Sequence, residues 1–227
     1  MVVDSIVYHP TYTKLLRFFD SSPRREKAFR LVAYLSRFLA YYAQRQGYPL
    51  QVVNKFLSLK TNATFIRKGL RFLKPLNHIE IAAKLFDNKN VEFRWANIIR
   101  NLCLAGYLTL DSIVWFKMMG LINAKKYPNL GKYATYFWLF SLIAGLINGF
   151  QKLVSFKAYK SNADESDEKL KSVNSQLYQT RRKLIWDALD CFIALNLTGY
   201  LHFTEGDIGL AGTITSIMGL NDLWATA

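Results

Sequence analysis

An uncharged run of 19 residues from Tyr133 to Gln151, bounded by Lys132 and Lys152, constrains the fold of this chain more than any other feature. At about 1.5 Å per residue, a helix of this length nearly spans a hydrocarbon core of about 30 Å. Aromatic residues, among them Tyr133 and Trp138, gather at one end of the run, as they do at a membrane interface. The run therefore predicts a transmembrane helix, with a buried helix of a large soluble bundle as the alternative.

The composition agrees with helices rather than a turn-rich β protein. Apolar residues make up 51% of the 227 residues, whereas there are only 5 prolines and 12 glycines. Three further apolar stretches, 98–122, 184–204 and 208–221, are each compatible with a membrane span, a re-entrant piece or a helix packed on the bilayer. We therefore expect an all-α, membrane-associated protein with a basic, amphipathic N-terminal half and hydrophobic helices in the C-terminal half.

The same patterns divide the chain into four regions. We expect a basic region with amphipathic helices at 1–97, hydrophobic helices including the best span at 98–154, an exposed and mobile polar linker at 155–180, and C-terminal hydrophobic helices at 181–227. The linker is rich in Lys, Ser, Asn, Asp and Glu, which is typical of an accessible segment. Its candidate phosphorylation sites are Ser166, Ser172 and Ser175.

Positive charge is concentrated in the first hundred residues, which carry 18 Lys and Arg against 6 Asp and Glu. Between Glu26 and Glu80 there are ten basic residues and no acidic one. Such a surface favours an anionic partner, and phospholipid headgroups and nucleic acid both offer dense phosphates. Charge alone does not choose between these two partners.

Segment 51–74 has helical periodicity with an apolar stripe beside a basic flank, and Pro75 should end or kink it. A helix that lies in a membrane interface has this layout, whereas a helix packed on a neighbour with a solvated flank is the alternative. The predicted membrane-insertion stripe comprises Val52, Phe56, Leu59, Ala63, Ile66, Leu70 and Leu73. The predicted headgroup-binding residues are Lys55, Lys60, Arg67, Lys68, Arg71 and Lys74.

Small residues recur every four positions inside the best span, at Ser141, Gly145 and Gly149. This spacing lets two helix backbones approach closely in lipid. We therefore predict helix–helix packing through these residues, and self-association of the chain into a homo-oligomer as a hypothesis.

The sequence offers no set of residues for catalysis or metal binding. His9, His78 and His202 are isolated, and neither Cys103 nor Cys191 has a partner at metal-ligand spacing. Both cysteines lie in apolar stretches, where a buried free thiol is expected. We therefore expect no enzyme, no cofactor and no metal site.

Acidic residues within the apolar stretches need a separate explanation. Asp111 precedes Ser112, where we expect a helix break, and Asp187 should pair with Lys183 one turn earlier. Alternatively, Asp111, Asp187 and Asp190 mark a polar pathway through the membrane.

Several segments of the chain, in the same order, resemble the sequences of the fungal peroxin-11 family, and together they extend over the chain from end to end. The opening VYHPTYTKLLRFFDSSPRREKAFRLVAYLSRFLA is similar to the N-terminal signature of that family. The segment RKGLRFLKPLNHIEIAAKLFDN, residues 67–88, resembles its amphipathic region. Further similar words are AGYLTLDSIVWFK at 105–117, RRKLIWDALDCFIALNLTGYL at 181–201 and the C-terminal GLAGTITSIMGLNDLW.

The resemblance implies a peroxisomal membrane protein that inserts an amphipathic helix, oligomerises, elongates the organelle and promotes its division. Its implied partners are an anionic phospholipid membrane, other copies of the chain, and a dynamin-related fission GTPase with its membrane adaptor, without nucleic acid. We expect both termini in the cytosol. The alternatives are a peroxisomal membrane channel or metabolite pore, and a soluble, basic, nucleic-acid-binding bundle.

Overall fold

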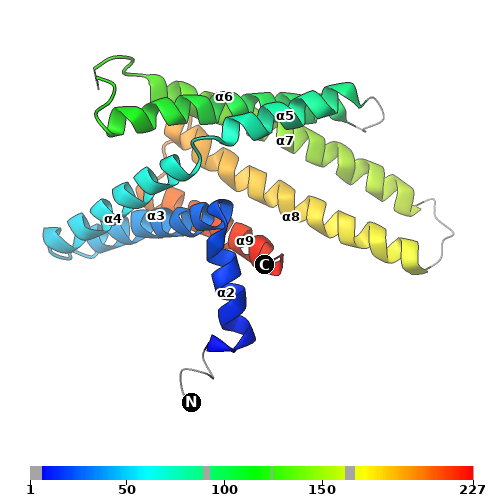
Figure 1. Ribbon diagram of the computed structural model, residues 1–227, viewed down its shortest axis with the longest axis horizontal. Coiled ribbons are helices and arrows are strands. Elements are labelled where there is room, and N and C mark those ends of the chain that lie inside the picture. The colour runs from blue at the N-terminus through cyan, green and yellow to red at the C-terminus, as the bar shows by residue number, and fades with distance from the viewer. Residues whose placement is uncertain (1–6, 89–92, 124, 162–166, 227) are drawn as a thin grey trace. The chain divides into compact units, whose positions relative to one another are not determined.

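The computed structural model describes residues 7–88, 93–123, 125–161 and 167–226 (Figure 1). This described part of the chain is almost entirely helical and contains no strand, so the predicted all-α fold is confirmed. Its helices are α2 (Pro10–Asp20), α3 (Ser22–Arg45), α4 (Leu50–Leu70), α5 (Lys74–Asp87), α6 (Arg94–Met118), α7 (Leu130–Ser161), α8 (Asp167–Thr198) and α9 (Glu205–Ala225).

The helices form two compact units. The first unit combines residues 1–72, 115–122 and 202–227, and the second combines 73–114 and 123–201. The C-terminal helix α9 thus joins the N-terminal helices rather than α8, which precedes it. These units differ from the four regions expected from composition, because composition does not reveal which distant segments pack together.

In the first unit, α3 lies between α4 and α9 and runs antiparallel to both (Figure 1). The contact with α9 is close because glycines face bulky residues of α3. A Cβ atom on Gly209 would lie 2.6 Å from the backbone nitrogen of Phe38, and one on Gly212 would meet the Tyr34 ring. Only glycine lets the backbones of α3 and α9 approach this closely.

Local signals define the helix ends. Helix α2 begins at Pro10, the first-turn position that tolerates a missing N–H, and the side chain of His9 accepts a hydrogen bond from the Thr11 amide. Helix α9 begins with a capping box between Thr204 and Asp207. Helix α8 is followed by Gly199 with φ of 87°, a left-handed conformation that favours glycine.

In the second unit, α7 and α8 form an antiparallel pair joined through residues 162–166 (Figure 1). Helix α6 runs antiparallel to α7, because Asn97 meets Asn148 near one end and Tyr107 stacks with Trp138 towards the other. Helix α5 reaches α6 through His78 and Asn101, and through Phe86 and Trp95.

Two local expectations from the sequence are wrong. The helix expected over 51–74 ends at Leu70, and Pro75 lies in the first turn of α5 rather than at a kink. Asp111 lies inside α6 rather than at a break. The expected linker 155–180 is helical on both sides of residues 162–166, and most of its described residues are exposed. The mobility of the linker stays a prediction.

Candidate membrane-interaction site

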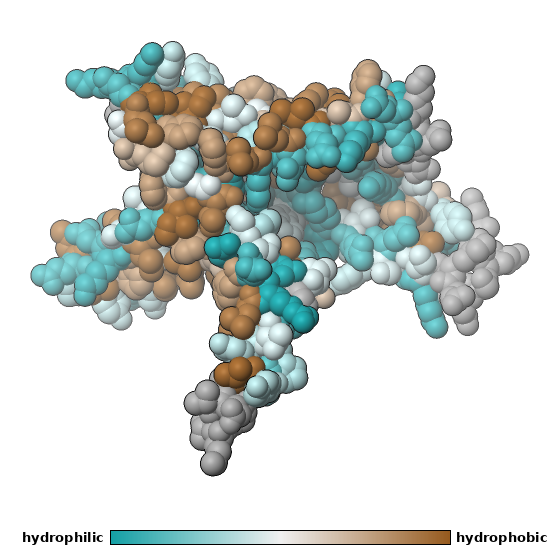
Figure 2. All heavy atoms as spheres, viewed as in Figure 1, coloured by the Kyte–Doolittle hydropathy of each residue, from teal (hydrophilic) through white to brown (hydrophobic). Residues whose placement is uncertain are grey.

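Large apolar side chains lie mostly outside in both units, and small ones lie inside. Of the 20 buried apolar residues described, 10 are alanines, whereas 42 large apolar or aromatic residues are exposed. Figure 2 shows such hydrophobic residues on the surface over α5 and α6. A soluble monomer rarely exposes so much contiguous apolar surface. Small residues between helices and large ones outside are instead typical of helices packed in lipid.

Helix α7 shows this arrangement most clearly. Its inward face carries Ser141, Leu142, Ala144, Gly145 and Asn148, all of which are buried. The opposite face is a continuous exposed stripe at helical spacing. That stripe comprises Tyr133, Phe137, Phe140, Ile143, Ile147, Phe150 and Val154.

Within the described residues, two helices are long and apolar enough to cross a membrane, namely α6 and residues Leu130–Lys160 of α7. Only 28% and 33% of their most apolar windows are buried within the protein. The central helix of a soluble bundle would be mostly buried, so this exposure favours the membrane interpretation of the 133–151 run.

The predicted insertion stripe of α4 is divided between two environments. Ala63 is buried against α3, and Val52, Phe56 and Leu70 are half-buried. Leu59 and Ile66 remain 48% and 39% exposed. Leu73 is exposed but follows the end of α4. The face that α4 turns inward is thus rotated from the predicted stripe by about one residue.

That rotation turns part of the basic flank inward. The buried Arg67 guanidinium donates to the Glu26 carboxylate of α3 at 3.1 Å, and Arg71 lies 4.0 Å from the same carboxylate. Lys60 lies 3.4 Å from Glu205 of α9. Burial lowers the pKa of Arg67, and the Glu26 charge opposes that shift. These basic residues therefore serve contacts within the first unit.

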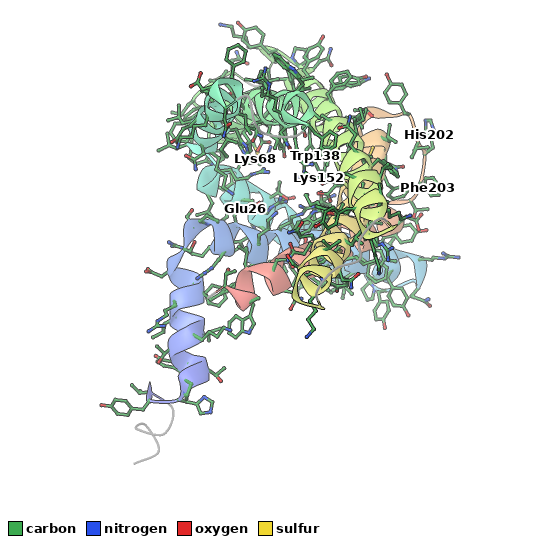
Figure 3. All side chains as sticks on the ribbon, turned by 90° about the vertical axis from the view of Figure 1, so that its right-hand side faces the viewer. Glu26, Lys68, Trp138, Lys152, His202 and Phe203 are labelled. Carbon is green, nitrogen blue, oxygen red and sulfur yellow. The ribbon has the colours of Figure 1, made fainter. Side chains whose placement is uncertain are left out.

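The remaining predicted headgroup residues lie further out. Lys55 is exposed, and Lys68 and Lys74 are half-buried. Figure 3 labels Lys68 on α4 and Glu26 on α3. Headgroup binding by any of these lysines stays a prediction, but Lys55 lies on the exposed side of α4 where a membrane could reach it.

Comparisons with known proteins now identify the family. The family model described as Peroxisomal biogenesis factor 11 (PEX11) matches residues 12–224. The chain belongs to the PEX11 family. It is 38% identical to Peroxisomal membrane protein PMP27 of Saccharomyces cerevisiae, with 99% of each chain covered. It is 34% identical to Peroxisomal membrane protein PMP30A of Candida boidinii, over 99% of this chain and 98% of that protein. It is 27% identical to Peroxisomal biogenesis factor 11 of Schizosaccharomyces pombe, over 96% and 97% of the respective chains.

The resemblance to peroxin-11 proteins is thus confirmed, and this PEX11 family member is a peroxisomal membrane protein involved in peroxisome biogenesis. No solved structure matches the chain.

The small residues of α7 in this PEX11 protein contact other helices of the same chain. A Cβ atom on Gly149 would meet Leu184 of α8, and one on Gly145 would overlap Arg100 of α6. Ser141 is almost fully buried. Because neighbouring helices of the same chain already cover this face, self-association through it stays a prediction.

The acidic residues of the second unit have partners. Asp187 accepts hydrogen bonds from both terminal nitrogens of Arg100, at 2.7 and 3.0 Å, and from Lys183 at 2.7 Å. The predicted Lys183–Asp187 pair is thus confirmed. The indole of Trp186 donates to Asp190. These contacts explain both buried carboxylates without a conducting pathway, so they add no support to the pore hypothesis.

The packing of Gly69 and Phe65 on the Trp115 ring was not predicted from the sequence. Helix α5 exposes Leu76 and Ile79. This helix lies within residues 67–88, the segment that resembles the amphipathic region of the family.

The linker serines are accessible where the structure describes them. Ser172 and Ser175 are exposed on α8. Ser166 lies outside the described residues. Phosphorylation of these serines stays a prediction.

Proposed function

We propose that this chain curves and elongates the peroxisomal membrane by wedging exposed apolar helix faces into one leaflet while α6 and α7 anchor it. The observation that carries this proposal is the outward position of Leu59 and Ile66 on α4, whose neighbouring face is fixed to α3 by the ion pair of Arg67 and Glu26. An apolar face of this kind sinks about 5 to 10 Å into the headgroup region. The inserted volume expands one leaflet relative to the other, which bends the bilayer.

Helix α5 offers a second exposed apolar face for the same activity. Leu76 and Ile79 are exposed near its N-terminus, and Phe86 near its C-terminus. Lys84 on this helix is also exposed and pairs with Glu80. Apolar residues beside basic ones suit the surface of an anionic bilayer.

The proposal includes partners that the family resemblance implies. Copies of the chain would assemble on the membrane, and a dynamin-related GTPase with its membrane adaptor would act on the elongated organelle. Both termini would face the cytosol. Protease protection of the termini on intact organelles tests this orientation, because cytosolic termini are cleaved without detergent.

The decisive experiment reconstitutes the purified full chain with vesicles that contain anionic phospholipid. The variant Leu59→Glu/Ile66→Glu places two charges on the exposed apolar face of α4, and we expect it to abolish tubulation while the chain stays membrane-bound. The matched control is Thr61→Glu/Asn62→Glu, which adds the same charge to exposed polar positions of the same helix. Equal tubulation by both variants would contradict the proposal, as would equal loss.

A further inference from the structure

The second unit contains a polar cavity that the proposed function does not use. It has a volume of about 500 Å³ and lies among α6, α7 and α8. Small-molecule sites commonly measure about 300 to 1000 Å³. The cavity is therefore large enough for a headgroup-sized ligand.

The lining is cationic. Arg100, Lys152 and Lys183 contribute three positive charges, and none of the lining residues is acidic. Asp187, just beyond the lining, pairs with Arg100 and Lys183. Lys152 has no acidic partner among the described residues, so the site retains positive charge that an anion would neutralise.

Asn148 also lines the cavity and is only 8% exposed. Its amide nitrogen donates to Asn97 Oδ1 at 2.6 Å, whereas its own Oδ1 is shielded from solvent. The two asparagines thus join α6 and α7 at the wall of the cavity.

Glycines create the space. Gly145 and Gly149 line the cavity, and a Cβ atom on Gly145 would overlap the Arg100 guanidinium. A side chain at Gly145 would displace Arg100, and one at Gly149 would displace Leu184 of α8. The glycines of α7 thus leave room for the Arg100 guanidinium at the cavity, and they also allow α7 to pack closely on its neighbouring helices.

The position along α7 suits a lipid headgroup. Lys152 is the first charged residue after the uncharged run 133–151 and is labelled on α7 in Figure 3. The cavity residues 145–156 straddle the end of that run. The end of an apolar span is the depth at which lipid phosphates lie.

We propose that this cavity binds a phosphate group, as in the headgroup of an anionic phospholipid or in a soluble phosphate ester. Lys152 and Arg100, which line the cavity, face the phosphate. This site is distinct from the apolar faces of α4 and α5 and does not depend on membrane curvature.

Native mass spectrometry of the full chain in neutral detergent tests the proposal, with phosphatidylinositol and phosphatidylcholine as probes. Calorimetric titration with glycerol 3-phosphate tests the soluble source. Loss of one charge-assisted hydrogen bond should weaken binding about tenfold in Lys152→Gln. Lys157→Gln is the control because Lys157 is exposed on the same helix outside the cavity. Lys152→Arg should restore binding.

Binding of phosphatidylinositol over phosphatidylcholine, weakened by K152Q and not by K157Q, would support a lipid ligand. The same dependence with glycerol 3-phosphate would support a soluble ligand. If the chain binds neither phosphatidylinositol nor glycerol 3-phosphate, the proposal is overturned. Equal weakening of binding by K152Q and K157Q would also overturn it. Thermal unfolding followed by circular dichroism verifies that each variant is folded.

Discussion

Replacing Glu26 with Gln should unfold the first unit at a much lower temperature. The Glu26 side chain is only 3% exposed and lies 3.1 Å from Arg67 and 4.0 Å from Arg71. Removing one partner of a buried ion pair costs about 3 to 5 kcal/mol, because the other charge stays buried without compensation. We expect the lower end, about 3 kcal/mol, because glutamine still accepts one hydrogen bond.

The assay measures thermal unfolding of the full chain in neutral detergent. Trypsin cleavage within α3 and α4 reports the unfolding of the first unit. In a unit of about 100 residues, each kcal/mol shifts Tm by about 4 to 8 °C, so Glu26→Gln should lower Tm by at least about 10 °C. The control Glu205→Gln removes an exposed carboxylate and should cost less than about 1 kcal/mol. The double variant Glu26→Leu/Arg67→Met should recover part of the loss, because it removes the buried Arg67 charge, although the Arg71 charge stays. A Glu26→Gln protein that unfolds within a few degrees of the unmodified chain would refute the reasoning.

Two further predictions concern α9. Gly209→Ala should destabilise the first unit by about 1 to 3 kcal/mol in thermal unfolding, because its Cβ meets the Phe38 backbone, whereas Gly131→Ala, with no atom nearby, should not destabilise the protein. The hydrogen bond from Arg37 lowers the pKa of Glu205, so the pair stabilises the fold above the ordinary glutamate pKa and loses this effect as pH falls through the lowered pKa. Stability measured at acidic pH should therefore decline less in Arg37→Gln than in the unmodified chain, and an unchanged acid dependence would contradict the assignment.

Several helices could be predicted from sequence because their signals are local. The uncharged run 133–151 lies within helix α7, and most of the periodic segment 51–74 lies within α4. The pairing of Asp187 with Lys183 was also predictable, since these residues lie one helical turn apart. Hydrophobic period and i, i+4 spacing are properties of a single segment.

The inward face of α4 could not be predicted, because it depends on distant residues. Glu26 lies 41 positions before Arg67, and Trp115 lies 46 positions after Gly69. The helical period alone places Arg67 beside the stripe and leaves open whether it faces lipid or a carboxylate. The ion pair between Arg100 and Asp187 joins residues 87 positions apart. It was not predicted for the same reason.

The ion pairs also decide how α4 can meet a bilayer. Lifting the helix off α3 would leave Glu26 and Arg67 without each other, at a cost of about 3 to 5 kcal/mol. Leu59 and Ile66 each retain roughly half of their side-chain area for burial, worth about 1 kcal/mol apiece. These two side chains do not offset the loss of the pair. We therefore expect α4 to stay attached to α3 during the proposed insertion. The first unit would then enter the leaflet as one body, and the exposed face of α4 would determine the depth of the wedge.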